Sequence, residues 1–127
     1  MCNNNCNGNC NGNCNENRNK QNHVHELLGS TDFEGNCSGC HNHRIATVSG
    51  EAIKTCKSHI HEVTFRTDFA DEHYHEFCGK TGEAIDVGGG KHVHYLKDCT
   101  EQENGHEHKF QLATLIESPT DFEYCDK

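Results

Sequence analysis

Apolar residues in this chain occur in short alternating runs, each following a pair of histidines. The runs include Val63 and Phe65, the surroundings of Phe77 and Leu96, and the stretch from Phe110 to Ile116. Alternation with a period of two is typical of strands that bury one face, and no segment sustains the helical period of about 3.6 residues. Glycine-rich or polar segments separate the runs, as hairpins require. We therefore expect an all-β chain.

The pattern recurs three times. Residues 23–33 align without a gap with residues 59–69, and both segments end in Thr-Asp-Phe. Residues 41–53 align in the same way with 73–85, and a more diverged copy begins at His92. Internal repeats of this kind indicate an array or a pseudo-symmetric fold. We divide the chain into an asparagine- and cysteine-rich leader and a His-rich β domain with three repeats: 1–22, then 23–127 comprising 23–58, 59–91 and 92–127.

Three repeats of two strands each predict a small antiparallel barrel or sandwich with approximate threefold symmetry; the alternative is a stacked β-solenoid. Gapless alignment preserves strand phase, so equivalent histidines should occupy equivalent positions, around the axis or at the seams between repeats. Successive histidine pairs are 14 residues apart within the second and third repeats but 18 apart within the first. The four extra residues, around Asn36–Cys40, should form a loop in the first repeat only.

All 12 histidines of the chain belong to six His-x-His pairs. Residues i and i+2 of a strand point to the same face, so each pair forms a fork of two imidazoles. Neutral imidazole is the commonest metal ligand in proteins, and two forks on neighbouring strands supply four nitrogens. The candidate metal ligands are His23, His25, His41, His43, His59, His61, His73, His75, His92, His94, His106 and His108.

The ligand type favours a divalent transition metal, with zinc or copper expected first and nickel also suited to imidazole. Carboxylates flank several pairs and would complete a metal shell or orient the rings from behind. These are Glu26, Glu62, Asp71, Glu72, Glu76 and Glu107. In the alternative reading, the histidines only stack on one another along a polar sheet face.

The composition predicts a thin core. Hydrophobic residues make up 31% of the 127 residues, tryptophan is absent and ten residues are cysteine. Small domains that bury little apolar surface need additional cross-links for stability. The residues of this chain offer two kinds, bound metal ions and disulfides. An even, abundant cysteine content also suits an oxidising final location.

Four leader cysteines recur every four residues. Because the leader has no apolar residue besides Met1 and its cysteines, it should not fold alone, and its thiols are free to reach other chains. The candidates for intersubunit disulfides are Cys2, Cys6, Cys10 and Cys14. The alternatives are a metal-chelating tail and a merely disordered one.

Cys37, Cys40 and His41 form a Cys-x-x-Cys-His motif, which is the attachment signature of covalent haem c. In that reading His41 is the axial ligand. A structural disulfide or a loop beside a metal site is the other interpretation, since His41 also begins a His-x-His pair.

The formal net charge of −9 argues against nucleic acid or an anionic membrane as a partner. No apolar stretch is long enough for membrane insertion, and no signal peptide is visible. We find no nucleophile triad, phosphate loop or nucleotide fingerprint, and repeated near-copies do not suit the asymmetric site of an enzyme. We expect a protein that is not an enzyme.

Four segments carry a resemblance to a known family: HNHR from His41, DEHYHEF from Asp71, GGGKHVHY from Gly88 and GHEHKFQLATLI from Gly105. Over roughly residues 23–117 the chain resembles the YmaF family of spore-forming bacteria. The resemblance implies a histidine pattern and a bacterial spore context, without an activity. The leader is similar in composition to the N-terminal connectors of endospore appendage subunits, which cross-link neighbours in a fibre.

Together these features predict a metal-binding structural subunit that assembles with itself into an extracellular fibre or a spore-surface layer. Histidine–metal sites and intersubunit disulfides would stabilise it. The first alternative is a soluble cytoplasmic protein that binds or buffers metal. The second is a small c-type haem protein that uses the CSGCH motif.

Overall fold

The structure is a computed structural model that describes residues 23–35 and 39–120. All regular elements in these ranges are β-strands, which confirms the all-β prediction. No helix in the same ranges is long and apolar enough to cross a membrane. The leader (1–22), with its four cysteines, and Cys37 lie outside the described residues.

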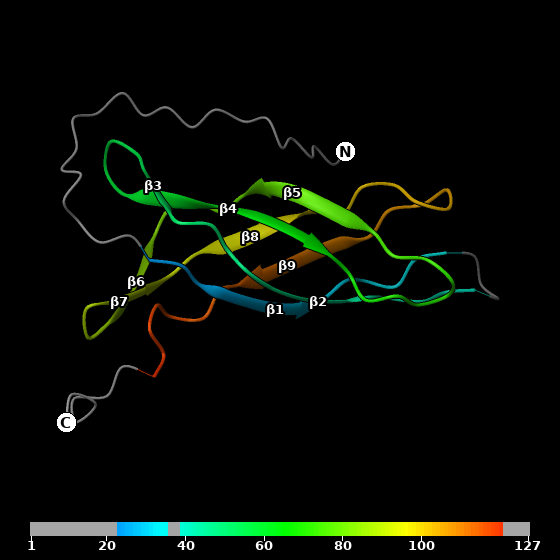
Figure 1. The fold of residues 1–127 in the computed structure, drawn as a ribbon, viewed down its shortest axis with the longest axis horizontal. Coiled ribbons are helices and arrows are strands. Elements are labelled where there is room, and N and C mark those ends of the chain that lie inside the picture. Colours follow the sequence, from blue (N-terminus) through cyan, green and yellow to red (C-terminus); the bar gives the residue numbers. More distant parts are fainter. Residues whose placement is uncertain (1–22, 36–38, 121–127) are drawn as a thin grey trace.

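Nine strands are present in the described part of the chain: β1 (Glu26–Ser30), β2 (Arg44–Val48), β3 (Ala52–Lys54), β4 (His59–Arg66), β5 (Glu76–Lys80), β6 (Ile85–Gly88), β7 (Lys91–Val93), β8 (Tyr95–Cys99) and β9 (Lys109–Ala113). Each repeat contributes one main antiparallel hairpin, namely β1-β2, β4-β5 and β8-β9. β3 pairs with the outer edge of β4, and β6 and β7 form a small hairpin of their own. The main hairpins run along the long axis of the molecule (Figure 1).

The described strands form four small antiparallel sheets, and neither a closed barrel nor a solenoid is found among them. A barrel needs a continuous ladder between all neighbouring strands, whereas these hairpins are joined by short groups of bonds near the strand ends. A backbone hydrogen bond joins each hairpin to the next. The N–H of Asp32 donates to the Lys109 carbonyl at 2.9 Å, that of Asp68 to the Arg44 carbonyl at 3.1 Å, and that of Glu101 to the Glu76 carbonyl at 2.8 Å. Because these three bonds occupy equivalent places in the three repeats, the hairpins have approximate threefold symmetry.

The alternation along each hairpin turns one face of every main strand toward a shared core. Three phenylalanines are at its centre: Phe65 stacks on Phe77 with ring centroids 5.1 Å apart, and Phe110 meets Phe77 edge-on, also at 5.1 Å. The other members of the core are Leu27, Ile45, Val63, Leu96 and Leu112. A core of this size buries little apolar surface, so the fold needs stabilisation from elsewhere.

The hairpin tips explain the longer first repeat. In the second repeat Ala70 forms an isolated antiparallel β-bridge with His73, and in the third Glu103 forms one with His106. The tips of these two hairpins are therefore two-residue turns. Both turn residues have positive φ, 54° and 67° at Asp71 and Glu72, and 58° and 81° at Asn104 and Gly105. Such angles are typical of type I′ turns. In the first repeat Glu34 bridges His41. The extra residues therefore lie at the tip of this hairpin, where 36–38 are outside the described part.

Candidate metal centres

The histidine pairs gather into two clusters. The first cluster comprises His23, His25, His59, His61, His92 and His94. The second cluster comprises His41, His43, His73, His75, His106 and His108. Each repeat contributes one pair to each cluster, so three forks meet where the sequence suggested two. β4 begins in the first cluster and leads to the turn before the second, which places the clusters at opposite ends of the core (Figure 1).

The second histidine of each pair, here called the inner histidine, is buried, and the first, the outer histidine, is more accessible in most pairs. Burial disfavours the imidazolium form and lowers histidine pKa values, and the charge repulsion of neighbouring imidazoles adds to the effect. The pKa of His61 is lowered to about 3, and the pKa values of His59, His75, His94 and His108 to about 4. These five histidines are therefore neutral at pH 7, which is the form that binds metal.

Hydrogen bonds fix which ring nitrogen faces the centre of each cluster. Every inner histidine has Nδ1 within 2.8–3.1 Å of a backbone carbonyl, on Leu115, Asp68, Gly50, Glu101, Gly82 or Asp32. In the second cluster the outer rings do the same with Gly39, Asp71 and Asn104 at 2.8, 2.8 and 3.3 Å. A carbonyl only accepts, so Nδ1 carries the hydrogen and Nε2 keeps its lone pair. This is the usual arrangement behind metal-binding histidines.

The Nε2 atoms of each cluster converge on a common centre. In the first cluster Nε2 of His92 lies 3.1 Å from Nε2 of His23 and 3.0 Å from that of His59. In the second, Nε2 of His41 lies 3.3 Å from that of His73. The Nε2 atoms of His43, His61 and His108 are fully buried and have no hydrogen-bond partner among the described residues. Buried acceptors without a partner are costly, and a cation at the centre of each cluster would satisfy them.

A serine or threonine six residues after each inner histidine completes the support. The six residues are Thr31, Ser49, Thr67, Thr81, Thr100 and Thr114, and all are buried. Each hydroxyl oxygen accepts the backbone N–H of the inner histidine on the paired strand at 3.0–3.1 Å. Sequence reasoning missed these residues, although the recurrence of Ser or Thr six residues after all six inner histidines was a visible signal.

Replacing Thr67 with valine should destabilise the protein by about 1–3 kcal/mol, because the buried His75 N–H loses its acceptor while side-chain volume is retained. Thr67 Oγ1 accepts that N–H at 3.0 Å and donates to the Asp68 carbonyl at 3.0 Å, to which His43 Nδ1 also donates. Urea unfolding at fixed metal concentration measures the change. Thr64→Val is the control: Thr64 is exposed on β4, three residues before Thr67, and the variant should stay within about 0.5 kcal/mol of wild type. Equal stability of T67V and T64V would show that this support is dispensable.

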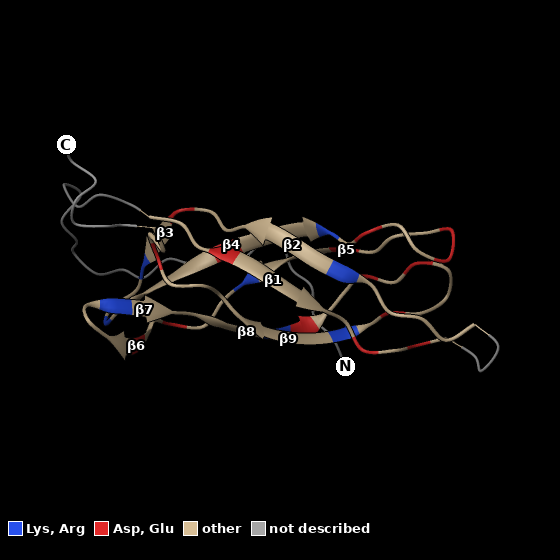
Figure 2. Ribbon diagram, turned by 90° about the horizontal axis from the view of Figure 1, so that it is seen from below, with Lys and Arg blue, Asp and Glu red and all other residues tan. Residues whose placement is uncertain are grey.

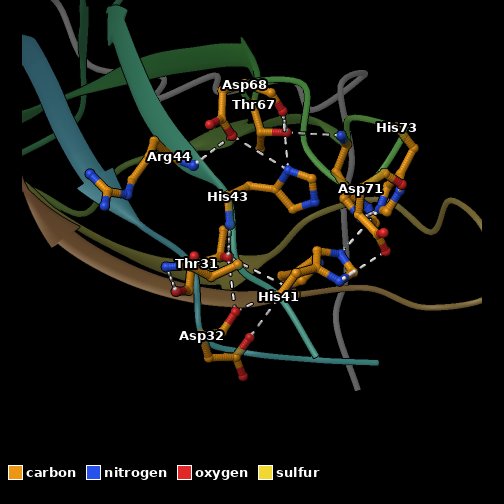
Figure 3. Close-up of polar contacts among 12 residues, drawn as sticks. Thr31, Asp32, His41, His43, Arg44, Thr67, Asp68, Asp71 and His73 are labelled. Atoms are coloured by element: carbon orange, nitrogen blue, oxygen red, sulfur yellow. Dashed lines mark hydrogen bonds and ion pairs between the residues drawn. The ribbon is translucent and has the colours of Figure 1, made fainter. Parts of the chain in front are cut away.

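Carboxylates stand behind several rings. Asp71 and Asp68 oxygens lie 3.4 and 3.5 Å from Nδ1 of His41 and His43 (Figure 3), and Glu117 lies 3.3 Å from Nδ1 of His92. Acidic residues also lie along the loops at the end of the molecule that holds the second cluster (Figure 2). Among the described residues neither group of potential ligands includes a carboxylate. Of the flanking carboxylates considered from sequence, Asp71 is found in the orienting role.

The haem and disulfide predictions rest on residues that are only partly described. Nε2 of His41 points into the second cluster, 3.2 Å from Nε2 of His106, which favours a loop beside a metal site over an axial haem ligand. Cys40 is exposed and is not in a disulfide, whereas Cys37 lies outside the described residues. Cys2, Cys6, Cys10 and Cys14 also lie outside them, so their role stays a prediction.

Comparison with known proteins gives one family. The family model named YmaF, described as spore germination protein GerY/YamF, matches residues 20–116. No curated protein and no solved structure matches the chain. The matched segment spans all six histidine pairs and the three main hairpins. The chain belongs to the YmaF family, whose description refers to spore germination.

Proposed function

We propose that this chain is a metal-stapled structural protein of the spore, in which each histidine cluster binds one divalent metal ion. One observation carries the proposal. The Nδ1 atoms of the inner histidines donate to backbone carbonyls, so their Nε2 lone pairs face a common centre and three of them have no partner in the described protein. In the second cluster all six rings are held in this way, and lone pairs that face one centre repel one another unless a cation lies among them.

The position of the clusters supports a structural role. Each cluster takes one histidine pair from every repeat, so a bound ion would tie the three hairpins together at one end of the core. The eight-residue apolar core lies between the two clusters. Metal binding to a site that is absent from the unfolded chain contributes its binding energy directly to folding.

Metal analysis of single-cluster variants tests the proposal. Wild-type protein purified without chelator should contain two equivalents of transition metal per chain, and His61→Ala and His75→Ala should each contain one, since they remove an inner ligand from different clusters. Tyr74→Phe lies between His73 and His75 and keeps the ring over which Arg66 packs, so it should retain both equivalents. Less than half an equivalent of any transition metal in wild-type protein would refute the proposal.

We also propose that the chain assembles with itself at the spore surface. Family membership supports the spore context, and four leader cysteines at regular spacing support covalent links between subunits. The main alternative, a cytoplasmic metal buffer, would need ligands that exchange readily. The buried inner histidines favour permanent binding instead, because all six are at most 1% exposed.

Deleting residues 1–19 should leave the β domain folded and abolish disulfide-linked assemblies, because the leader has little to bury but carries the proposed linking thiols. Non-reducing electrophoresis and circular dichroism measure both effects. Cys40→Ser is the matched control: Cys40 is exposed and not in a disulfide, so its loss should leave the assemblies intact. If full-length protein runs as a monomer without reductant, or if the truncated protein still forms covalent assemblies, the leader has another role.

A further inference from the structure

We infer that each cluster is a closed octahedral site of six imidazole nitrogens, built for a six-coordinate divalent ion such as nickel(II) or iron(II). This inference rests on the proposed metal-binding function and specifies the class of ion. The sequence alone favoured zinc or copper, because it suggested two forks, and hence four ligands, per site.

The packing of the rings defines the polyhedron. In the first cluster every ring meets the others edge-to-face at centroid distances of 4.4–5.3 Å, with one exception for each ring. The pairs without a ring contact in this described cluster are His23 with His94, His59 with His25, and His92 with His61. In an octahedron each corner has four neighbouring corners and one opposite corner. The ring contacts follow the same pattern, so the six rings occupy the corners of an octahedron.

The second cluster repeats this arrangement with other residues. Its rings meet at 4.6–5.0 Å, and the opposite pairs among its described rings are His41 with His75, His73 with His108, and His106 with His43. In both clusters each opposite pair joins an outer histidine of one repeat to an inner histidine of another. The three outer rings form one triangular face of the octahedron and the three inner rings form the opposite face. The approximate threefold axis that relates the repeats therefore passes through the site.

The distances between ligand atoms fit this geometry. Neighbouring Nε2 atoms are 3.0–3.2 Å apart in the first cluster and 3.1–3.3 Å apart in the second. An octahedron has edges about 1.4 times its metal–ligand distance, so these edges correspond to metal–nitrogen bonds of roughly 2.2 Å, slightly longer than those of tetrahedral zinc. All six ligand atoms of the first cluster, and five of the second, lie within 4.8 Å of one another, as opposite corners of such an octahedron require. His43 is the sixth ring of the second cluster, and its Nε2 is buried without a partner among the described residues.

Six equivalent nitrogens discriminate between ions. Structural zinc prefers four ligands, so it would leave two buried lone pairs unsatisfied in each cluster. Copper(II) prefers a tetragonal arrangement, which the threefold relation of the rings opposes. Imidazole suits both nickel(II) and iron(II). Six nitrogen donors in a regular octahedron are a common shell for either ion in its high-spin form. A filled shell also leaves no position for water or substrate, which distinguishes the site from a catalytic metal centre.

Metal-free full-length protein loaded with nickel(II) alone tests the inference by X-ray absorption at the nickel edge. We expect two nickel ions per chain, each with six nitrogens at roughly 2.2 Å and with the outer-shell scattering of six imidazoles. In competition with an equal concentration of zinc(II), nickel should be retained in excess. Nickel bound through four or fewer imidazoles, or displacement of nickel by zinc, would overturn the octahedral assignment and leave the metal-binding function intact. Failure to bind either ion would refute the proposed function itself.

A ligand-deletion variant gives a second, independent readout. His59→Ala removes an outer ligand that is only half-buried, so water can take its place and the nickel should stay bound, unlike in the variants that lose a buried inner ligand. One coordination position should then be open, and added imidazole should shift the visible bands of the bound nickel. Wild type and Val24→Ala, which changes an exposed residue between two ligands, should show no shift. A shift in wild type would mean that the shell is open and would overturn the inference. If His59→Ala does not fold, the wild-type response to imidazole still decides the question.

Discussion

Metal removal should unfold the β domain at neutral pH. A structural metal site contributes about 10–16 kcal/mol to small metal-dependent folds, which is as large as the whole stability of a typical domain. Here the two proposed sites flank a core of only eight apolar side chains. After dialysis against a chelator, circular dichroism should lose the β-sheet signal and the cooperative melting transition, and one equivalent of metal per cluster should restore both.

His61→Ala and His75→Ala provide the graded comparison. Each should retain one metal ion and melt between the metal-free and the fully loaded protein. Tyr74→Phe, with its ring stacking retained, should melt as wild type does. A chelated protein that keeps the wild-type melting temperature would show that interactions other than metal binding suffice for stability, and the proposed structural role of the metal would be wrong.

Acid should destabilise the protein steeply between about pH 6.5 and pH 4. Burial and repulsion between imidazoles lower the pKa values of His59, His75, His94 and His108 to about 4, whereas an unfolded histidine titrates near 6.5. In that interval the unfolded chain binds more protons than the folded one, so stability falls as the pH falls. Each such histidine contributes a slope of about 1.4 kcal/mol per pH unit.

Because protons compete with metal for the same nitrogens, acid should also release the ions as the protein unfolds. Denaturant titrations from pH 8 to pH 4, with released metal measured by a colorimetric chelator, follow both events together. Thr67→Val should lower stability by a similar amount at every pH in this series, since it removes an uncharged hydrogen bond. Stability that is flat or increases toward pH 4 would contradict the burial of neutral rings.

The alternation of apolar positions was sufficient to predict strands, because each main strand buries one face. The repeat was sufficient to predict that equivalent histidines share an environment. The predicted closed barrel is not found among the described strands. Strand pairing within each hairpin is local in sequence, whereas pairing between hairpins depends on tertiary packing that the alternation of apolar residues does not determine. The turn at Asp71 and Glu72 was also not visible, since it lacks the glycine that usually marks such turns and glutamate rarely adopts positive φ.

The candidate ligands were identifiable as residue types, but their grouping was not. A His-x-His pair shows that two rings share a face, and it does not show how many pairs meet. His41 illustrates the difference. Its sequence context suggested haem attachment, whereas in the fold its Nδ1 donates to the Gly39 carbonyl and its Nε2 faces His73 and His106. Thr67 and its equivalents went unnoticed because their partners are on neighbouring strands.

Anomalous diffraction from crystals of the metal-loaded protein tests the central claim most directly. The account predicts two anomalous peaks per chain, one at the centre of each cluster, with the Nε2 atoms of its histidines around each peak. Anomalous density that is absent from both centres, or that is found only at surface carboxylates or cysteines, would contradict it.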